Sequence, residues 1–267
     1  MPDPYANIVE TDPSVVVRIA ERLEVRAADP NQRAMLASYL DRAAFVKGAQ
    51  VLEVGCGTGA VARAAAARRE VASVTAIDPS AVLIETAQKL AEGLTGLTFR
   101  VGDGRALPFE PEAFDGVIFH TTLCHIPNPE QALLEASRVL RPGGKIAVFD
   151  GDYATATVAT AEFDPLQACS RAVTANNVLD RWLVRRLPRL LSNAGFTDLN
   201  SQSHGYFDNE DPDYMLGHAE RGAELLEATG VIGRDLALAL KQEARRRAAD
   251  GTFFGHIAYA SFIARKA

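Results

Sequence analysis

Residues 51–59 of this chain read Val-Leu-Glu-Val-Gly-Cys-Gly-Thr-Gly, an apolar run that breaks into three alternating glycines. Apolar residues bounded by glycine are typical of a buried parallel strand. Glycines directly after such a strand let the backbone approach a ligand closely, where the next helix presents free N–H groups. This stretch therefore predicts an open α/β sheet that binds a ligand at the end of a strand.

A second apolar run predicts a carboxylate beside this turn. Val74-Thr75-Ala76-Ile77 ends at Asp78, nineteen residues after the last glycine. A carboxylate at the tip of the next strand can accept hydrogen bonds from both hydroxyls of a ribose. Together the two runs predict a nucleoside-binding crevice.

The glycine turn fits two classes of nucleoside cofactor. Gly55, Gly57 and Ala60 match the dinucleotide fingerprint. Gly55, Gly57 and Gly59 match the G-x-G-x-G turn of methyltransferases. Glu53 favours the second class, because its carboxylate would repel a pyrophosphate but attract the ammonium of a methionine moiety. A nicotinamide-dependent dehydrogenase remains the less favoured alternative.

Length and composition indicate a globular protein. The chain has 267 residues, of which 48% are hydrophobic and 23% charged, and this length suits one elaborated domain or two small ones. No apolar run approaches the roughly 20 residues that span a bilayer. The first residues lack the features of an export signal, and the three cysteines have no disulfide or metal-ligand spacing. These features predict a cytoplasmic protein with no membrane span and no metal.

The charge pattern argues against a nucleic-acid partner. The net charge is −6, and the basic residues are dispersed apart from clusters at 181–189 and 245–247. Such clusters are typical of helix ends and solvated helix faces. An acidic protein gains little from the counterion release that drives nucleic-acid binding.

Strands and helices alternate along the chain, as an α/β protein requires. The helix after the second strand is expected to begin around Pro79-Ser80. Residues 1–13 contain three prolines and are expected to form a mobile arm. Strands are expected at about 49–54, 72–77, 97–101, 116–119, 145–150, 197–207 and 254–265.

Three parts of the chain are expected on this basis. Residues 1–45 form an N-terminal helical arm, residues 46–207 and 251–267 the cofactor-binding domain, and residues 208–250 a helical insertion. The insertion is too long for a simple hairpin loop. The arm and the insertion form a lid over a pocket, or they pack on the sheet edge; both interpretations remain open.

Several segments between residues 45 and 150 resemble class I S-adenosylmethionine-dependent methyltransferases. The nearest type is the small-molecule subgroup (methyltransferase type 11) that includes the ubiquinone- and menaquinone-biosynthesis enzymes. The resemblance implies a Rossmann-like seven-stranded sheet in the order 3-2-1-4-5-7-6, with strand seven antiparallel and helices on both faces. The segments are Val51–Gly59, Ile77-Asp78, Gly102–Phe109, Phe114-Asp115, Leu123–His125 and Arg138–Gly144.

The resemblance also implies S-adenosylmethionine as the cofactor and assigns residues to its methionine end. Gly55, Gly57 and Gly59, with Cys56 among them, shape the turn beside the methionine moiety. Glu53 is oriented towards its ammonium.

The ribose and adenine are assigned to the next two strand ends. By the same resemblance, Asp78 binds the ribose and Pro79 offers apolar surface to the adenine. Asp103 accepts from the adenine amino group, with the Gly104 backbone nearby. His120 lies at the tip of the fourth strand, where the family's backbone meets the methionine moiety.

His125 is the candidate catalytic residue. It follows the fourth strand, and an imidazole titrates near neutrality, so it could take a proton from the methyl acceptor. A packing role for His125 is the alternative. Trp182, Phe253 and Phe254 are expected either to wall an apolar substrate pocket or to lie in the core.

We therefore expect an enzyme, a transferase that moves a methyl group to an O, N or C atom of a small, partly apolar metabolite. The alternative is a protein of the same fold that binds the cofactor but catalyses another reaction, such as a cyclisation, or serves as a binding partner. The expected partner is the small-molecule acceptor, and a homodimer is compatible with the sequence.

Overall fold

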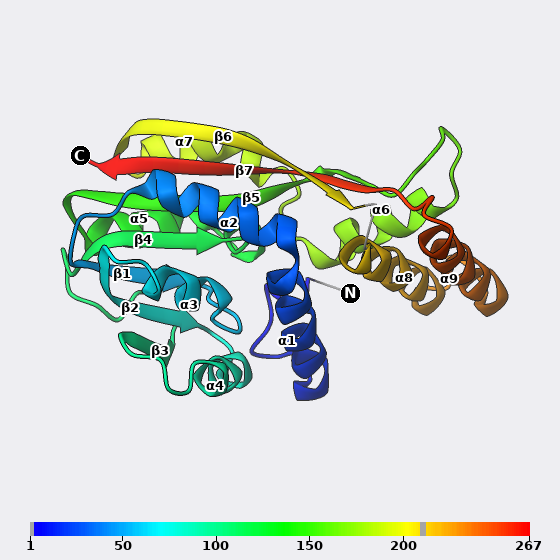
Figure 1. Ribbon diagram of the computed structural model, residues 1–267, viewed down its shortest axis with the longest axis horizontal. Helices are drawn as coiled ribbons and strands as arrows, with labels where there is room; N and C mark the ends of the chain where they lie inside the picture. The colour runs from blue at the N-terminus through cyan, green and yellow to red at the C-terminus, as the bar shows by residue number, and fades with distance from the viewer. Residues whose placement is uncertain (1–2, 209–211) are drawn as a thin grey trace.

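The computed structural model describes residues 3–208 and 212–267. Its centre is a seven-stranded sheet in the order β3-β2-β1-β4-β5-β7-β6, which confirms the predicted order (Figure 1). β7 pairs antiparallel with β5 and β6, and the other pairings are parallel. The strands are β1 (Ala49–Val54), β2 (Val71–Asp78), β3 (Leu97–Val101), β4 (Phe114–His120), β5 (Leu140–Thr157), β6 (Phe196–Asp208) and β7 (Gly255–Lys266).

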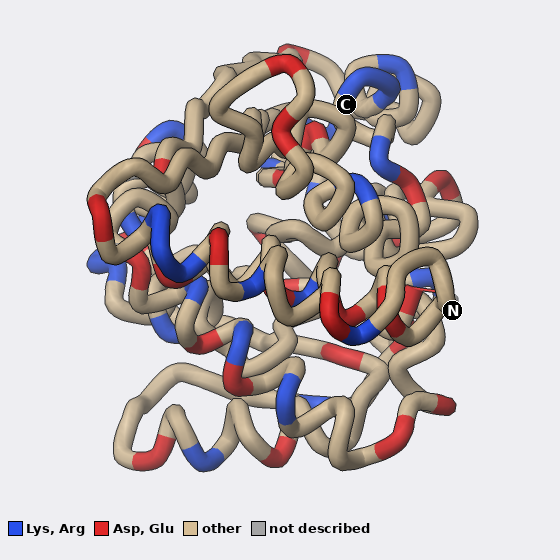
Figure 2. The backbone as a smooth tube through the Cα atoms, turned by 90° about the vertical axis from the view of Figure 1, so that its right-hand side faces the viewer, with Lys and Arg blue, Asp and Glu red and all other residues tan. Residues whose placement is uncertain are grey.

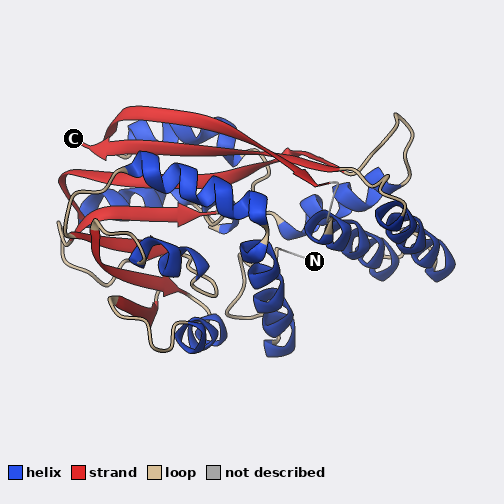
Figure 3. Cartoon of the chain, in the orientation of Figure 1, coloured by secondary structure: helices blue, strands red, loops and turns tan. Residues whose placement is uncertain are grey.

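Helices cover both faces of the sheet (Figure 3). One core packs Ile118 and Ala147 against α2 (Pro30–Ala43), α3 (Ala60–Ala66) and α4 (Ala81–Leu90). The other packs Val117 and Val148 against α5 (Pro129–Val139) and α7 (Leu183–Asn193). Successive strand residues point to opposite faces. With both faces buried, the central strands are apolar at nearly every position.

Three helices gather beyond one end of the sheet, and we call them the helical cap: α6 (Leu166–Asn177), α8 (Asp213–Ala228) and α9 (Arg234–Ala249). Figure 1 shows α1 (Pro13–Ala28) standing between this cap and the sheet. At Gly222 of α8, a side chain would collide with the backbone of Cys169 on α6. The missing side chain therefore allows α6 and α8 to pack in direct backbone contact.

The fifth strand is longer than predicted. It was expected at about 145–150, whereas β5 spans Leu140–Thr157. At its start, Leu140 pairs with Phe114 of β4. At its end, the pairing with β7 continues to Thr157 opposite His256. These long strands connect the sheet to the helical cap.

The N-terminal segment, residues 3–12, is packed on the protein, so the expectation of a mobile arm is wrong for it. The Asp3 side chain is buried and accepts a hydrogen bond from the backbone N of Leu179 at 2.9 Å. Ile8 is buried with Val16 and Ile19 of α1. These contacts close the segment over the end of the sheet.

The start of α4 also differs from the expectation. Ser80 Oγ accepts a hydrogen bond from the backbone N of Leu83 at 3.3 Å, so Ser80 is the N-cap and the helix begins at Ala81. Pro79 therefore precedes the helix and is left beside the end of β2.

Other features concern membranes and cysteines. Within residues 3–208 and 212–267, none of the helices is long and apolar enough to cross a membrane.

Cys56, Cys124 and Cys169 are buried free thiols, and burial raises the pKa of each. They are therefore packing residues rather than reactive thiolates.

Candidate functional site

A cavity of about 710 Å³ lies at the carboxyl ends of β1, β2 and β4. This volume is within the range of roughly 300–1,000 Å³ that small-molecule sites have. The walls come from the N-terminal segment, α1, α6, α8 and the turns after the strands. His125 and all the predicted cofactor residues except Gly59 line it, namely Glu53, Gly55, Cys56, Gly57, Asp78, Pro79, Asp103, Gly104 and His120.

The glycine turn after β1 forms the floor of the cavity. Gly55 has φ +73°, and a side chain there would collide with that of Thr122. Thr122 Oγ1 donates to the Gly55 carbonyl at 3.1 Å, which holds the turns after β1 and β4 together. Gly59 has φ +79° at the N-terminus of α3 and lies behind the cavity wall. Gly59 thus shapes the turn without facing the cavity.

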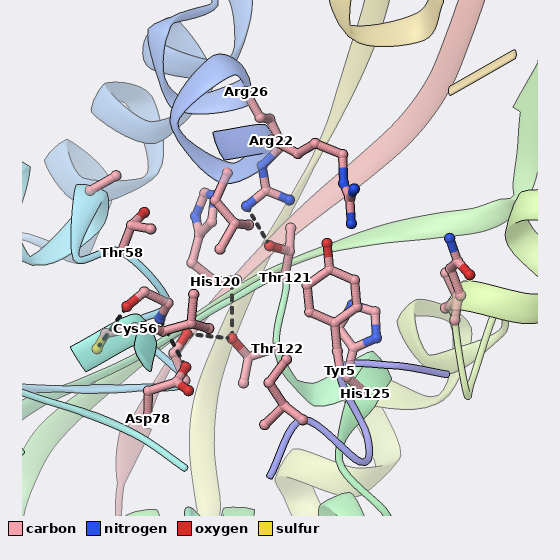
Figure 4. A pocket seen from close by; sticks show the side chains of 18 of the residues that line it. Tyr5, Arg22, Arg26, Cys56, Thr58, Asp78, His120, Thr121, Thr122 and His125 are labelled. Atoms are coloured by element: carbon pink, nitrogen blue, oxygen red, sulfur yellow. Dashed lines mark hydrogen bonds between the residues drawn. The ribbon is translucent and has the colours of Figure 1, made fainter. Parts of the chain in front are cut away.

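Asp78 lies at the tip of β2, below the turn at Cys56 (Figure 4). Its two carboxylate oxygens accept from the backbone N of Gly57 and of Ser80, both at 2.9 Å. Burial raises the pKa of Asp78 to about 6, although these hydrogen bonds oppose the shift. Each carboxylate oxygen can accept a further hydrogen bond from a ligand hydroxyl.

Glu53, near the end of β1, has an unsatisfied oxygen. The residue is 2% exposed, and Oε2 has no hydrogen-bond partner among the described residues. Burial raises the pKa of Glu53 to about 8, and the nearby charge of Asp78 adds to the shift. A buried carboxyl group with a free acceptor on a cavity wall suits a cationic ligand group. Together with the glycine turn, it fits the aminoacyl end of S-adenosylmethionine.

Asp103 is at the outer edge of the cavity. Its carboxylate forms an ion pair with Arg105 at 2.7 Å and accepts from the backbone N of that residue at 2.8 Å. The side-chain hydrogen bond from Arg105 is the main cause that lowers the pKa of Asp103. Asp103 is therefore an ionised acceptor at the rim.

His120 lines the cavity and is also in contact with core residues. Its Nδ1 lies 3.1 Å from the hydroxyl of Tyr39, and its ring stacks on Phe149 with centroids 4.8 Å apart. Burial, with a smaller contribution from Arg26, keeps the pKa of His120 well below its usual value. The uncharged imidazole ring therefore forms part of the cavity wall beside the glycine turn.

His125 is paired with a carboxylate that the sequence reasoning missed. Its Nδ1 lies 2.6 Å from Oδ2 of Asp3, and its ring packs against Tyr5 with centroids 4.6 Å apart. Because an ionised carboxylate only accepts hydrogen bonds, Nδ1 is the donor in this pair, and Nε2 is the nitrogen left for another partner. Asp3 is 122 positions away in the chain, so no local pattern could have revealed it.

Five arginines also line the cavity and were missed by the sequence reasoning: Arg22 and Arg26 on α1, Arg33 on α2, Arg105 after β3 and Arg221 on α8. Arg26 donates to Thr121 Oγ1 at 2.8 Å, directly after β4 (Figure 4). Because α1 and α8 are distant in the chain, spacing alone gives no signal for this group.

The aromatic residues considered as pocket walls lie elsewhere. Trp182 is 48% exposed and stacks under Arg185, with Cζ 4.3 Å from the ring centroid. Phe253 is in the core, and Phe254 packs edge-on against Phe207. In the described part of the chain, no group of acidic, His or Cys side chains could hold a metal ion.

The fold and the cavity together define a nucleoside-binding α/β protein. Comparison with known proteins identifies the family. The methyltransferase domain family matches residues 52–148. The phthiotriol/phenolphthiotriol dimycocerosates methyltransferase of Mycobacterium leprae is 33% identical over 189 residues, which is 65% of this chain and 69% of the relative. This chain belongs to the class I S-adenosylmethionine-dependent methyltransferases, and S-adenosylmethionine is its cofactor.

Two further similarities are informative. A demethylmenaquinone methyltransferase of Tropheryma whipplei is 38% identical over 101 residues, covering 38% of this chain and 41% of the relative. The crystal structure of the [4+2]-cyclase SpnF superposes with a TM-score of 0.55 at 25% identity, covering 88% of this chain and 80% of that one. The chain spans less than half the length of several curated relatives that it matches.

Proposed function

We propose that this protein transfers a methyl group from S-adenosylmethionine to an O, N or C atom of a small, partly apolar metabolite. The observation that carries the proposal is the continuity of one cavity, from the glycine turn with Glu53 and Asp78 to His125. A donor and an acceptor bound in the same cavity can be aligned for an in-line displacement.

The chain offers partners for each part of the cofactor. Glu53 would bind the ammonium, with the turn around Cys56 beside the methionine moiety. Asp78 would accept from the ribose hydroxyls, while Pro79, Asp103 and the Gly104 backbone would contact the adenine. Arg26, held at the end of β4 by Thr121, is suited to the methionine carboxylate. When bound, the cofactor supplies an electrophilic methyl group on its sulfonium.

His125 is the proposed base for an acceptor that loses a proton. Its Nδ1 is engaged by Asp3, so Nε2 is the nitrogen that would accept the proton. Asp3 stabilises the resulting imidazolium by its charge. Tyr5 of the N-terminal segment packs against the His125 ring and covers one side of it, which strengthens these interactions.

Incubation with methyl-labelled S-adenosylmethionine and candidate acceptors tests the reaction, because transfer labels the product. A cyclisation is the alternative, favoured by the similarity to SpnF, and it would convert the substrate without labelling it.

The variant Asp78→Ala tests whether Asp78 belongs to the cofactor site. We expect it to weaken S-adenosylhomocysteine binding by about 1–3 kcal/mol in calorimetry, the usual loss for a hydrogen bond to a charged group. An unchanged affinity would remove Asp78 from the site.

The basic clusters support a small molecule rather than nucleic acid as the partner. Arg185 pairs with Asp152 at 2.9 Å, and Arg246 pairs with Glu243 at 2.9 Å. Figure 2 shows basic and acidic segments interspersed along the chain.

The three free cysteines support a cytoplasmic setting. Light scattering would decide between a monomer and a homodimer.

A further inference from the structure

We infer that the cavity contains a subsite for an anionic group of the acceptor, a carboxylate or a phosphate, held between Arg22 of α1 and Arg221 of α8. This inference rests on the proposed function, because it concerns the molecule that receives the methyl group. The subsite is separate from the residues that hold the cofactor.

The first observation is the position of the two arginines. Both line the cavity, and they come from two helices that contact each other, α1 beside the sheet and α8 in the helical cap. Figure 4 shows the Arg22 side chain extending past Arg26 to the space above Tyr5, away from Asp78. Arg22 therefore belongs to the end of the cavity that contains Tyr5 and His125. Arg221 interacts electrostatically with Arg22 and Tyr5, so it belongs to the same end.

The second observation is that the two guanidinium groups repel each other. After burial, Arg22 is the largest influence that lowers the pKa of Arg221. Glu224 opposes this effect, but its carboxylate is already paired with Lys241 at 2.7 Å. Two like charges in a partly buried site are costly unless an anion lies between them.

The third observation is the lack of a protein anion for Arg22. Within residues 3–208 and 212–267, Arg22 has no ion pair or hydrogen bond to its side chain. By contrast, Arg63 and Arg247 pair with Glu24 and Asp164. The acidic residues Glu10 and Asp213 also line the cavity, but both are exposed at its rim.

The surroundings indicate what kind of anion fits. Tyr5 and Tyr214 line the same end of the cavity, and their hydroxyls can donate hydrogen bonds. Guanidinium groups bind carboxylates and phosphates in bidentate geometry. Val173 of α6 supplies apolar wall, so the ligand would combine an anionic group with an apolar body.

Calorimetry with the full chain, first saturated with S-adenosylhomocysteine, tests the subsite. The probes are benzoate, phenyl phosphate and the uncharged benzyl alcohol. We expect both anions to bind more tightly than benzyl alcohol, and the tighter anion identifies the preferred group. Arg22→Gln and Arg221→Gln should each weaken anion binding by about 10- to 100-fold.

Arg18→Gln is the matched control, because Arg18 is exposed one turn earlier on α1 and does not line the cavity. It should leave anion binding unchanged. Each variant should keep S-adenosylhomocysteine affinity within twofold, which shows that it is folded. If S-adenosylhomocysteine binds but the anions do not, or if both glutamine variants bind anions normally, the inference is wrong. If the unmodified chain does not bind S-adenosylhomocysteine, the proposed function fails instead.

Discussion

The two ends of the cavity are built in different ways. The end that we propose for the cofactor, the cofactor end, consists of backbone turns and short carboxylates at the tips of parallel strands, such as Asp78 at the end of β2. The end that we propose for the methyl acceptor, the acceptor end, consists of His125 and of long side chains from α1, α8 and the N-terminal segment. The first end depends on backbone geometry, and the second on individual side chains. Substitutions should therefore affect binding of the cofactor at one end and turnover at the other.

The largest expected effect is at the acceptor end. His125→Gln should lower kcat by about 10²- to 10⁴-fold, because a positioned base contributes that much. Binding of S-adenosylhomocysteine should be unchanged, since the cofactor end is intact. Steady-state kinetics with the acceptor identified by labelling is the measurement, and His256→Gln on β7, outside the cavity wall, is the control. A kcat within twofold of the original would leave His125 with a packing role only.

A glycine substitution tests the cofactor end. Gly55→Ala places a side chain at φ +73° against Thr122, so S-adenosylhomocysteine affinity should fall by about 100-fold through strain and collision. Gly48→Ala is the matched control, because Gly48 has φ +78° but nothing within 4 Å of the added atom. It should lower the melting temperature without changing affinity. Equal losses of affinity in both variants would contradict a specific role for the turn.

The pH dependence of binding tests Glu53. Its pKa of about 8 in the free protein means that the carboxyl is mostly protonated at pH 7, and a bound ammonium would lower that pKa. Binding should therefore release a proton, and S-adenosylhomocysteine affinity should rise by up to about tenfold per pH unit from pH 6 towards pH 8. Calorimetry in buffers of different ionisation enthalpy measures the proton. Glu53→Gln should flatten this dependence, and an unflattened profile would exclude Glu53 as its source.

The same shift gives a prediction for stability. The folded-state pKa of Glu53 is raised above its unfolded value of 4.5, so the folded protein binds more protons between these pKa values. Its contribution to the free energy of unfolding therefore falls as pH rises from about 4.5 to 8. Glu53→Gln should reduce this decline in denaturant titrations. A decline of the same size in the variant would show that other groups cause it.

The smallest expected effect comes from Asp3, which acts through His125. Asp3→Asn removes the charge that would stabilise the imidazolium, and kcat should fall by about tenfold. The KM for S-adenosylmethionine should not change if Asp3 only positions His125. Asp12→Asn is the control, because asparagine is also a good N-cap at the start of α1. A rise in KM with unchanged kcat would indicate a purely structural role for Asp3.

The difference between the two ends also explains what could be predicted from the sequence. The residues around Gly55 are contiguous, and parallel strands bring Asp78 and Asp103 to the same edge, so these positions could be predicted to share a site. The strand order followed from the family resemblance. Asp3 reaches His125, and Arg221 reaches the cavity, only because the N-terminal segment and the helical cap fold over this end of the sheet. Contacts between distant helices leave no periodic signal, so the acceptor end could not be predicted.

Gly222 has a consequence for how such a site could change its ligand. Because α8 touches the backbone of α6 there, the axis of α8 is fixed by main-chain contact rather than by replaceable side chains. Diversification of the acceptor would then proceed by exchanging the residues that α8 presents to the cavity, such as Tyr214, His218 and Arg221. The position of α8 would then stay the same while the side chains that recognise the acceptor differ.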